Sequence, residues 1–187
     1  SFDMDVAKVK LEQQGFDGVT SGPDKFALEW VQEFPVNPSA DGTTPRVYIG
    51  GVILKHTGLT SVLIVAGSTR GLGNGYGFGT QGDSDEDGFV TLLDTETGNL
   101  IQKGQARIGS TDDDVIAGIC HDDNDYSSFY VVGATKGQLQ RASGGTSEEQ
   151  TIPDGSLQAF VMKMNVVTLT PIWTVQWGAV KSGKGET

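Results

Sequence analysis

Short runs of apolar and β-branched residues, each bounded by Gly, Asp, Asn or Ser, recur along this chain and predict β-strands. The pattern is clearest at Leu63-Ile-Val-Ala-Gly-Ser-Thr-Arg-Gly71, which returns sixty-six residues later as Phe129-Tyr-Val-Val-Gly-Ala-Thr-Lys-Gly137. Both segments contain an apolar run, Gly, a small residue, Thr, a basic residue and Gly. A match of this length indicates an internal repeat.

The repeat contains four predicted strands per unit. The first strand is expected at 3–10, 87–94 and 158–165, the second at 26–34, 99–105 and 170–177, the third at 47–54 and 114–120, and the fourth at 63–71 and 129–137. Four short strands in each unit of about 70 residues predict stacked antiparallel sheets rather than helices.

One predicted strand also fits a helical pattern, because Trp30 and Phe34 are spaced four residues apart. The same spacing returns at Trp173 and Trp177, where the segment follows Pro171. Proline does not belong in a helix interior. The repeat therefore favours a strand at both places.

Residues 66–73 resemble the glycine-rich turn of short-chain dehydrogenases, in which a helix N-terminus binds the cofactor pyrophosphate. The next residues, 74–82, carry Gly at alternate positions, and each interior Gly costs about 1 kcal/mol of helix stability. No Tyr is followed by Lys at the spacing that these enzymes use for proton transfer. The repeat explains the glycines better, and no dinucleotide cofactor is expected.

Composition and charge narrow the class of protein. Gly makes up 27 of 187 residues, about twice the usual ~7%, which indicates many turns. The net charge of −11 argues against nucleic acid or an anionic membrane as partner. No apolar run approaches the ~20 residues that a membrane helix needs, so no membrane insertion is expected.

The four parts of the unit together resemble the β-propeller repeat family of secreted and cell-surface proteins (SBBP-like repeats). The resemblance is carried by Phe89-Val90, Phe160-Val161-Met162-Lys163, Trp173, Asp114, Gly118-Ile119 and the segment from Val131 to Thr135. It covers most of the chain apart from the long loops. Asp5, Leu92 and Gln102 depart from the family pattern and leave the subfamily open.

The resemblance implies an all-β protein made of four-stranded antiparallel blades. The chain is expected to form one partial β-propeller, with approximate blades at 1–86, 87–157 and 158–187, the last incomplete. Two and a half blades cannot close a ring, so we expect an incomplete segment of a larger propeller. The loops 71–86 and 137–158 leave the same corner of successive units and are candidates for a binding surface.

The clearest candidate site is the acidic loop before the strand at 87–94. Asp83, Asp85 and Asp87, followed by Gly88, match the start of a calcium-binding loop, in which alternate carboxylates face one hard cation. Asp94 stands at the twelfth position, but a strand would carry it roughly 20 Å away. The alternatives are calcium bound by the three carboxylates and a backbone carbonyl, or a solvated acidic turn.

Other chemistry-bearing residues have simpler interpretations. The acidic clusters 112–114 and 122–125 fall at strand entries and turns, where Asx side chains bond the local backbone. His56 and His121 occupy equivalent places after the third strand of each unit and are interpreted as turn residues.

The single cysteine, Cys120, follows an apolar run and is predicted to be a buried small hydrophobe. Trp30, Trp173 and Trp177 are predicted to be core residues that pack one blade on the next, with ligand stacking as the alternative.

The sequence thus predicts a non-catalytic structural or protein-interaction module of an extracellular or cell-surface assembly. Its expected partners are other protein subunits or the rest of a longer chain, with a glycan as a further candidate. One alternative is a calcium-stabilised adhesive or glycan-binding module. Another, of a different class, is the scaffold part of an enzyme whose site lies outside this segment.

Overall fold

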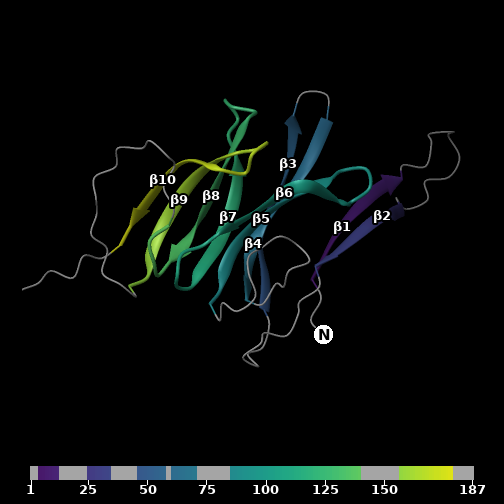
Figure 1. The fold of residues 1–187 in the computed structure, drawn as a ribbon. Helices are drawn as coiled ribbons and strands as arrows, with labels where there is room; N and C mark the ends of the chain where they lie inside the picture. Colours follow the sequence, from purple (N-terminus) through teal and green to yellow (C-terminus); the bar gives the residue numbers. More distant parts are fainter. Residues whose placement is uncertain are drawn as a thin grey trace, which may run out of the picture.

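The computed structural model describes residues 4–12, 25–34, 46–57, 60–70, 85–139 and 156–178, and every regular element among them is a β-strand (Figure 1). The strands are β1 (Met4–Glu12), β2 (Lys25–Phe34), β3 (Arg46–Thr57), β4 (Thr60–Arg70), β5 (Asp87–Asp94), β6 (Leu100–Ile108), β7 (Asp114–His121), β8 (Ser128–Thr135), β9 (Gln158–Asn165) and β10 (Pro171–Trp177). All ten predicted strands are present, and the ambiguous second one, β2, is a strand and not a helix.

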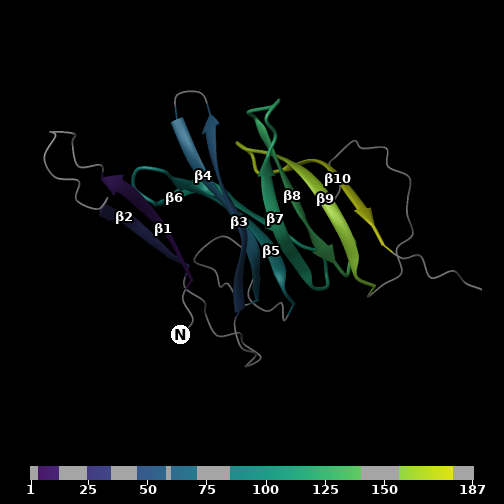
Figure 2. The ribbon, with the colours of Figure 1, turned by 180° about the vertical axis from the view of Figure 1, so that it is seen from behind.

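The strands pair in chain order. One four-stranded antiparallel sheet has the order β3-β4-β5-β6, a second has the order β10-β9-β8-β7, and β1 and β2 form a separate hairpin. Both views place the first sheet between the hairpin and the second sheet (Figures 1 and 2). The chain is therefore an all-β protein whose four-stranded antiparallel sheets follow one another as β-propeller blades do.

The sheets are out of phase with the sequence units. Each sheet takes its first two strands from the end of one unit and its last two from the start of the next, so the boundaries 86/87 and 157/158 fall inside sheets. The long loops mark where the sequence pattern restarts, whereas a sheet ends where its strands stop pairing. Neighbouring units are thereby joined by the hydrogen bonds of a shared sheet.

The two sheets repeat each other down to their turns. In the β5–β6 turn, Asp94 Oδ1 accepts hydrogen bonds from the main-chain N–H groups of residues 96 and 97, and the Gly98 N–H donates to the Asp94 carbonyl at 2.9 Å. In the β9–β10 turn, Asn165 and Leu169 take the same roles, with the latter bond at 3.0 Å. Among the described residues, Gly98 and Leu169 are also the two with positive φ, at 71° and 51°.

The core lies on both faces of the first sheet. Its face towards the second sheet contributes Ile64, Ala66 and Val90 to the main cluster, which includes Phe129, Val131, Phe160 and Met162 of the second sheet. Its other face forms a smaller cluster of Val65, Phe89 and Leu93, on which Trp30 of the hairpin packs. Val65 and Val131, equivalent in the repeat, are both fully buried beside equivalent phenylalanines.

The two sheets approach most closely where β7 crosses β3. A Cβ atom on Gly50 would lie 2.6 Å from the Ile116 carbonyl oxygen, and one on Gly51 would lie 2.8 Å from Ile119 Cγ2. A β-bulge at Gly50 separates the pairs formed by Ile49 and Gly51. The sheets can pack at this distance only because these two positions carry no side chain.

The equivalent glycine of the second sheet allows a matched test. A Cβ atom on Gly118 would meet only Val132 Cγ2, at an ordinary 3.4 Å. We expect Gly51→Val to lower the free energy of unfolding by about 1–3 kcal/mol, since Ile119 must be displaced. Gly118→Val should stay within about 0.5 kcal/mol of the wild type. Urea unfolding of the two variants measures both, and equal losses would contradict the packing described here.

Candidate interaction surface

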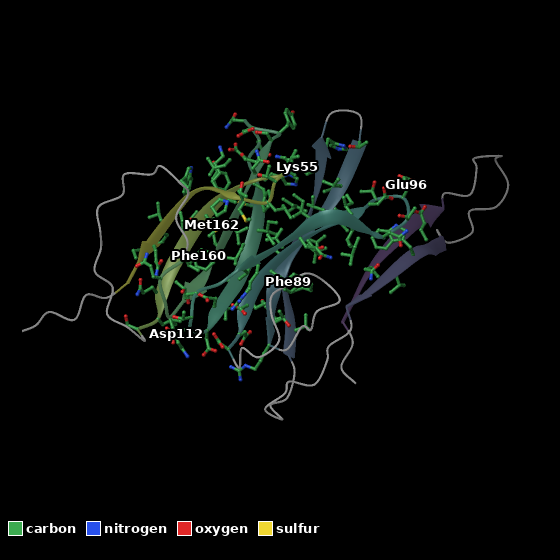
Figure 3. The ribbon with its side chains drawn as sticks, in the orientation of Figure 1. Lys55, Phe89, Glu96, Asp112, Phe160 and Met162 are labelled. Atoms are coloured by element: carbon green, nitrogen blue, oxygen red, sulfur yellow. The ribbon has the colours of Figure 1, made fainter. Side chains whose placement is uncertain are left out.

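A buried lysine joins the two sheets at one end (Figure 3). Lys55, on β3, is only 2% exposed, and its Nζ donates to the carbonyl oxygens of Asp122 at 3.2 Å and Asp125 at 3.1 Å. Both carbonyls belong to the β7–β8 turn, and the ammonium also lies 5.7 Å from the Tyr126 ring centroid. Each carbonyl also accepts a main-chain hydrogen bond at 3.3 Å, from the Asp125 N–H and the Ser128 N–H respectively, so the lysine adds a charged donor to both.

The β7–β8 turn is held in place by its own acids. Asp122 Oδ1 accepts from the Asn124 N–H at 3.1 Å, and Asp125 Oδ1 accepts from the Ser127 N–H at 2.9 Å. The prediction that these carboxylates bond the local backbone is confirmed. Lys163 of β9 adds ion pairs of 2.8 Å to Asp122 and 3.2 Å to Asp125.

These contacts shift the pKa values of all three charged groups. The hydrogen bond to Asp122 is the main cause of the raised pKa of Lys163, and the hydrogen bond from Lys163 lowers the pKa of Asp122. Hydrogen bonds from Ser127 and Ser128 hold the pKa of Asp125 well below its usual range. The cluster is therefore fully charged at neutral pH and balances its own charge in part.

The other end of the interface uses Asp113, in the segment between β6 and β7. Its Oδ1 lies 3.3 Å from Arg70 at the end of β4 and accepts from the Glu86 N–H at 3.1 Å. Its Oδ2 lies 2.6 Å from Lys136, and this hydrogen bond is the main cause of the lowered pKa of Asp113. Arg70 and Lys136 are equivalent in the repeat, so one carboxylate pairs with the same position of both sheets.

The structure describes only part of the predicted calcium loop. Asp83 lies outside the described residues, while Asp85 and Asp87 lie within them. Asp87 Oδ2 forms a 2.7 Å ion pair with Arg107, so one of the predicted cation ligands is already bound to a guanidinium. Among the described residues, no group of three or more His, Cys, Asp or Glu is placed to hold a metal ion. Calcium binding stays a prediction.

Two carboxylates near this position have raised pKa values. Burial, only partly offset by Arg107, raises the pKa of Asp87 to about 6. Burial also raises the pKa of Asp114, whose Oδ2 accepts hydrogen bonds from the Ser110 N–H and hydroxyl. Asp94 lies at the far end of β5, as a strand requires, and caps a turn instead of closing a cation site.

The second sheet has one face without a covering sheet among the described residues; we name it the open face. It carries Gly118, Val132, Trp173, Val175 and Trp177, on β7, β8 and β10. Gly118 pairs with Val132, and Val132, Val161 and Val175 follow one another across β8, β9 and β10. The side chains of Val132, Trp173, Val175 and Trp177 are 38%, 39%, 52% and 45% exposed.

Two sequence predictions are corrected on this face. Cys120 is exposed rather than buried, because it lies on β7 beside Tyr130, and Tyr130 neighbours the exposed Trp173 with ring centroids 5.9 Å apart. Trp173 and Trp177 were expected in the core, but they are partly exposed. Only Trp30 packs between sheets as predicted, with its indole N–H donating to the Thr95 carbonyl at 3.1 Å.

The open face is equivalent in the repeat to a face that is buried. Ala66 and Val90 of the first sheet are fully covered by the second sheet, and their counterparts in the second sheet are Val132 and Val161. The bulge at Gly50 returns at Ala117, so that Gly118 takes the place of Gly51. The open face thus has the apolar pattern and the glycine of a sheet–sheet interface.

A cavity of about 570 Å³ lies where the segment after β6 meets the end of β8. Its floor is apolar, with Met162 and Met164, and its polar lining includes Arg107 and Ser110. Arg107 is paired with Asp87, and the Ser110 hydroxyl is bonded to Asp114. These two polar side chains are therefore engaged within the protein, and Thr111, Asp112 and Gln138 complete the polar lining.

A scan against protein-family models and a search of curated proteins find no match for this chain. The resemblance to SBBP-like propeller repeats accordingly stays a prediction from the sequence. Within the part of the chain that the structure describes, there is no helix of the length and apolar character needed to span a membrane.

Lys55 gives the first test of the interface. We expect Lys55→Met to lower the free energy of unfolding by about 2–3 kcal/mol, because the apolar stem is kept while two buried carbonyls lose their charged donor. The neighbouring His56 is exposed, so His56→Gln should change stability by less than about 0.5 kcal/mol. Urea unfolding checks both values, and a neutral Lys55→Met would show that the ammonium does not hold the sheets.

The pH dependence of stability should show two opposite limbs. A carboxyl with a raised pKa binds its proton more tightly in the folded chain, so Asp87 and Asp114 stabilise the fold at pH 4. The contribution of Asp87 is lost as the pH rises through about 6, and the contribution of Asp114 is lost in the same direction. Asp113, Asp122 and Asp125 have lowered pKa values, so their contribution is lost as the pH falls below about 4.

The free energy of unfolding should therefore be greatest near pH 4–5 and fall by on the order of 2 kcal/mol towards pH 7. Asp87→Asn should flatten most of the limb between pH 4 and pH 6, measured by urea unfolding across that range. An unchanged slope in this variant would remove Asp87 as its cause.

Proposed function

We propose that this chain is a non-catalytic structural and protein-interaction module, whose open face packs against another protein in a larger extracellular or cell-surface assembly. The observation that carries this proposal is the partial exposure of Val132, Trp173, Val175 and Trp177 on one sheet face. Contiguous apolar surface rimmed by polar residues marks interaction sites more often than it marks ordinary protein surface.

Two features support packing against protein. The open face repeats the position of the face that is buried between the two sheets, including its glycine. The charged groups along its edge are already paired, since Lys163 contacts both Asp122 and Asp125. A surface that combines paired charges with exposed valine and tryptophan side chains has the composition of a protein-binding surface.

The non-catalytic part of the proposal is supported by the cavity and by the shifted carboxyls. A catalytic acid or base combines a shifted pKa with access to substrate. Asp87 and Asp114 have shifted pKa values, but neither lines the cavity, and both are engaged with Arg107 or Ser110. The acidic net charge of −11 disfavours nucleic acid as a partner.

Photocrosslinking in the natural source tests the proposal. A benzoylphenylalanine at Val175 should crosslink to protein, whereas the same group at Val167, which is 73% exposed in the β9–β10 turn, should not. Mass spectrometry of the crosslinked peptide should identify the partner protein and the segment that lies on the open face. Equal crosslinking from both positions, or none from position 175, would contradict an interface on the open face.

A further inference from the structure

We infer that the open face is built to receive one kind of partner, a further β-sheet of the same repeat whose first strand has the pattern of β7. This inference rests on the proposed function and specifies the chemistry of the partner. The pattern of β7 is an acidic residue before the strand, β-branched residues, then Ala-Gly and a further Ile, as in Asp113-Asp-Val-Ile-Ala-Gly-Ile119.

The interface inside the chain shows how one sheet recognises the next. The first sheet places Gly51 beneath the Ile119 side chain of β7 and offers the Ser68 hydroxyl, which accepts from the Ile116 N–H at 2.7 Å. The main chain of Glu86 exchanges hydrogen bonds with the residues that precede and begin β7. The first sheet thus recognises the incoming strand by the space that its glycine leaves for a side chain. Hydrogen bonds to the main chain of the strand's first half add to this recognition.

The open face offers the corresponding positions. Gly118 stands where Gly51 stands, and the space above it is free of other described residues within 4 Å except Val132. Leu157 corresponds to Glu86 at the entry of the next strand, and its side chain is 66% exposed. Ala134 replaces Ser68 and cannot accept a hydrogen bond, so this interface is more apolar than the one inside the chain.

Gly118 distinguishes a sheet from a glycan. Two exposed indoles on one strand, Trp173 and Trp177, also fit stacking against sugar rings. A sugar chain lying on these indoles has no need of a glycine on β7, two strands away from β9 and three from β10. A sheet whose first strand places an isoleucine side chain over this position, as Ile119 lies over Gly51, does need it. The glycine therefore favours the sheet.

An extended chain tests the inference. Gly178 follows β10 as Gly109 follows β6, so residues 1–178 followed directly by a second copy of 110–178 place a new sheet on a connection of native length. With the tryptophans of the added copy replaced by Phe, acrylamide quenching reports on the first copy. We expect Trp173 and Trp177 to lose quenching relative to residues 1–187, and the urea midpoint to rise because a new sheet–sheet interface has formed.

Gly118→Val in the first copy is the matched control. It should restore the quenching of Trp173 and Trp177 and cancel the gain in urea midpoint, while leaving the unextended chain as stable as the wild type. Unchanged quenching on extension, an added sheet that stays unfolded, or docking that survives Gly118→Val would each overturn the inference. Protection of the indoles in residues 1–187 by a soluble β-glucan, without protection by the added sheet, would overturn it in favour of a glycan.

The crosslinking experiment and the chain-extension experiment test the two proposals independently of each other. Crosslinking from position 175 to a protein of another architecture, together with an extended chain whose added sheet does not dock, would reject the repeat sheet as partner and keep the proposed function. Failure of the crosslink and of the extension together would reject both.

Discussion

The close crossing of β7 over β3 is the contact on which the rest of the structure depends. At this point the backbone of β7 occupies the space where a side chain at Gly50 would stand, and the Ile119 side chain occupies that of Gly51. The approach brings Ile116 within reach of Ser68 and seats Ile64, Ala66 and Val90 against the second sheet. Dispersion attraction and apolar burial increase steeply as two sheets come closer together. The absence of two side chains at the crossing therefore allows many other side chains to come into contact.

Charge is used at the ends of the interface and kept out of its centre. Lys55 at one end and Asp113 at the other each join the two sheets, and both are engaged with more than one partner. An ion pair at a partly wet edge costs less desolvation than one in the middle of an apolar layer. The edges therefore set how the sheets are aligned, while the apolar centre supplies most of the burial energy.

Much of the fold follows from local pattern, whereas the site does not. Alternation and turn residues located all ten strands, and Pro171 decided the doubtful one, because strands of this kind depend on neighbours close in sequence. Lys55 was missed, since its carbonyl partners lie 67 and 70 residues away and no spacing encodes them. The exposure of Cys120 and Trp173 was missed because burial depends on what covers a face.

Each sheet takes its strands from two consecutive sequence units, and this has a consequence for synthesis on the ribosome. Strands β3 and β4 leave the exit tunnel as a bare hairpin, and they gain a stable partner only when the following unit has also emerged. An isolated hairpin is marginally stable in water. The intervening segment can lengthen at little cost, since the entropy of closing a loop grows only with the logarithm of its length. Differences in length between units therefore cost least in this segment, which is also the segment that must be synthesised before the sheet can form.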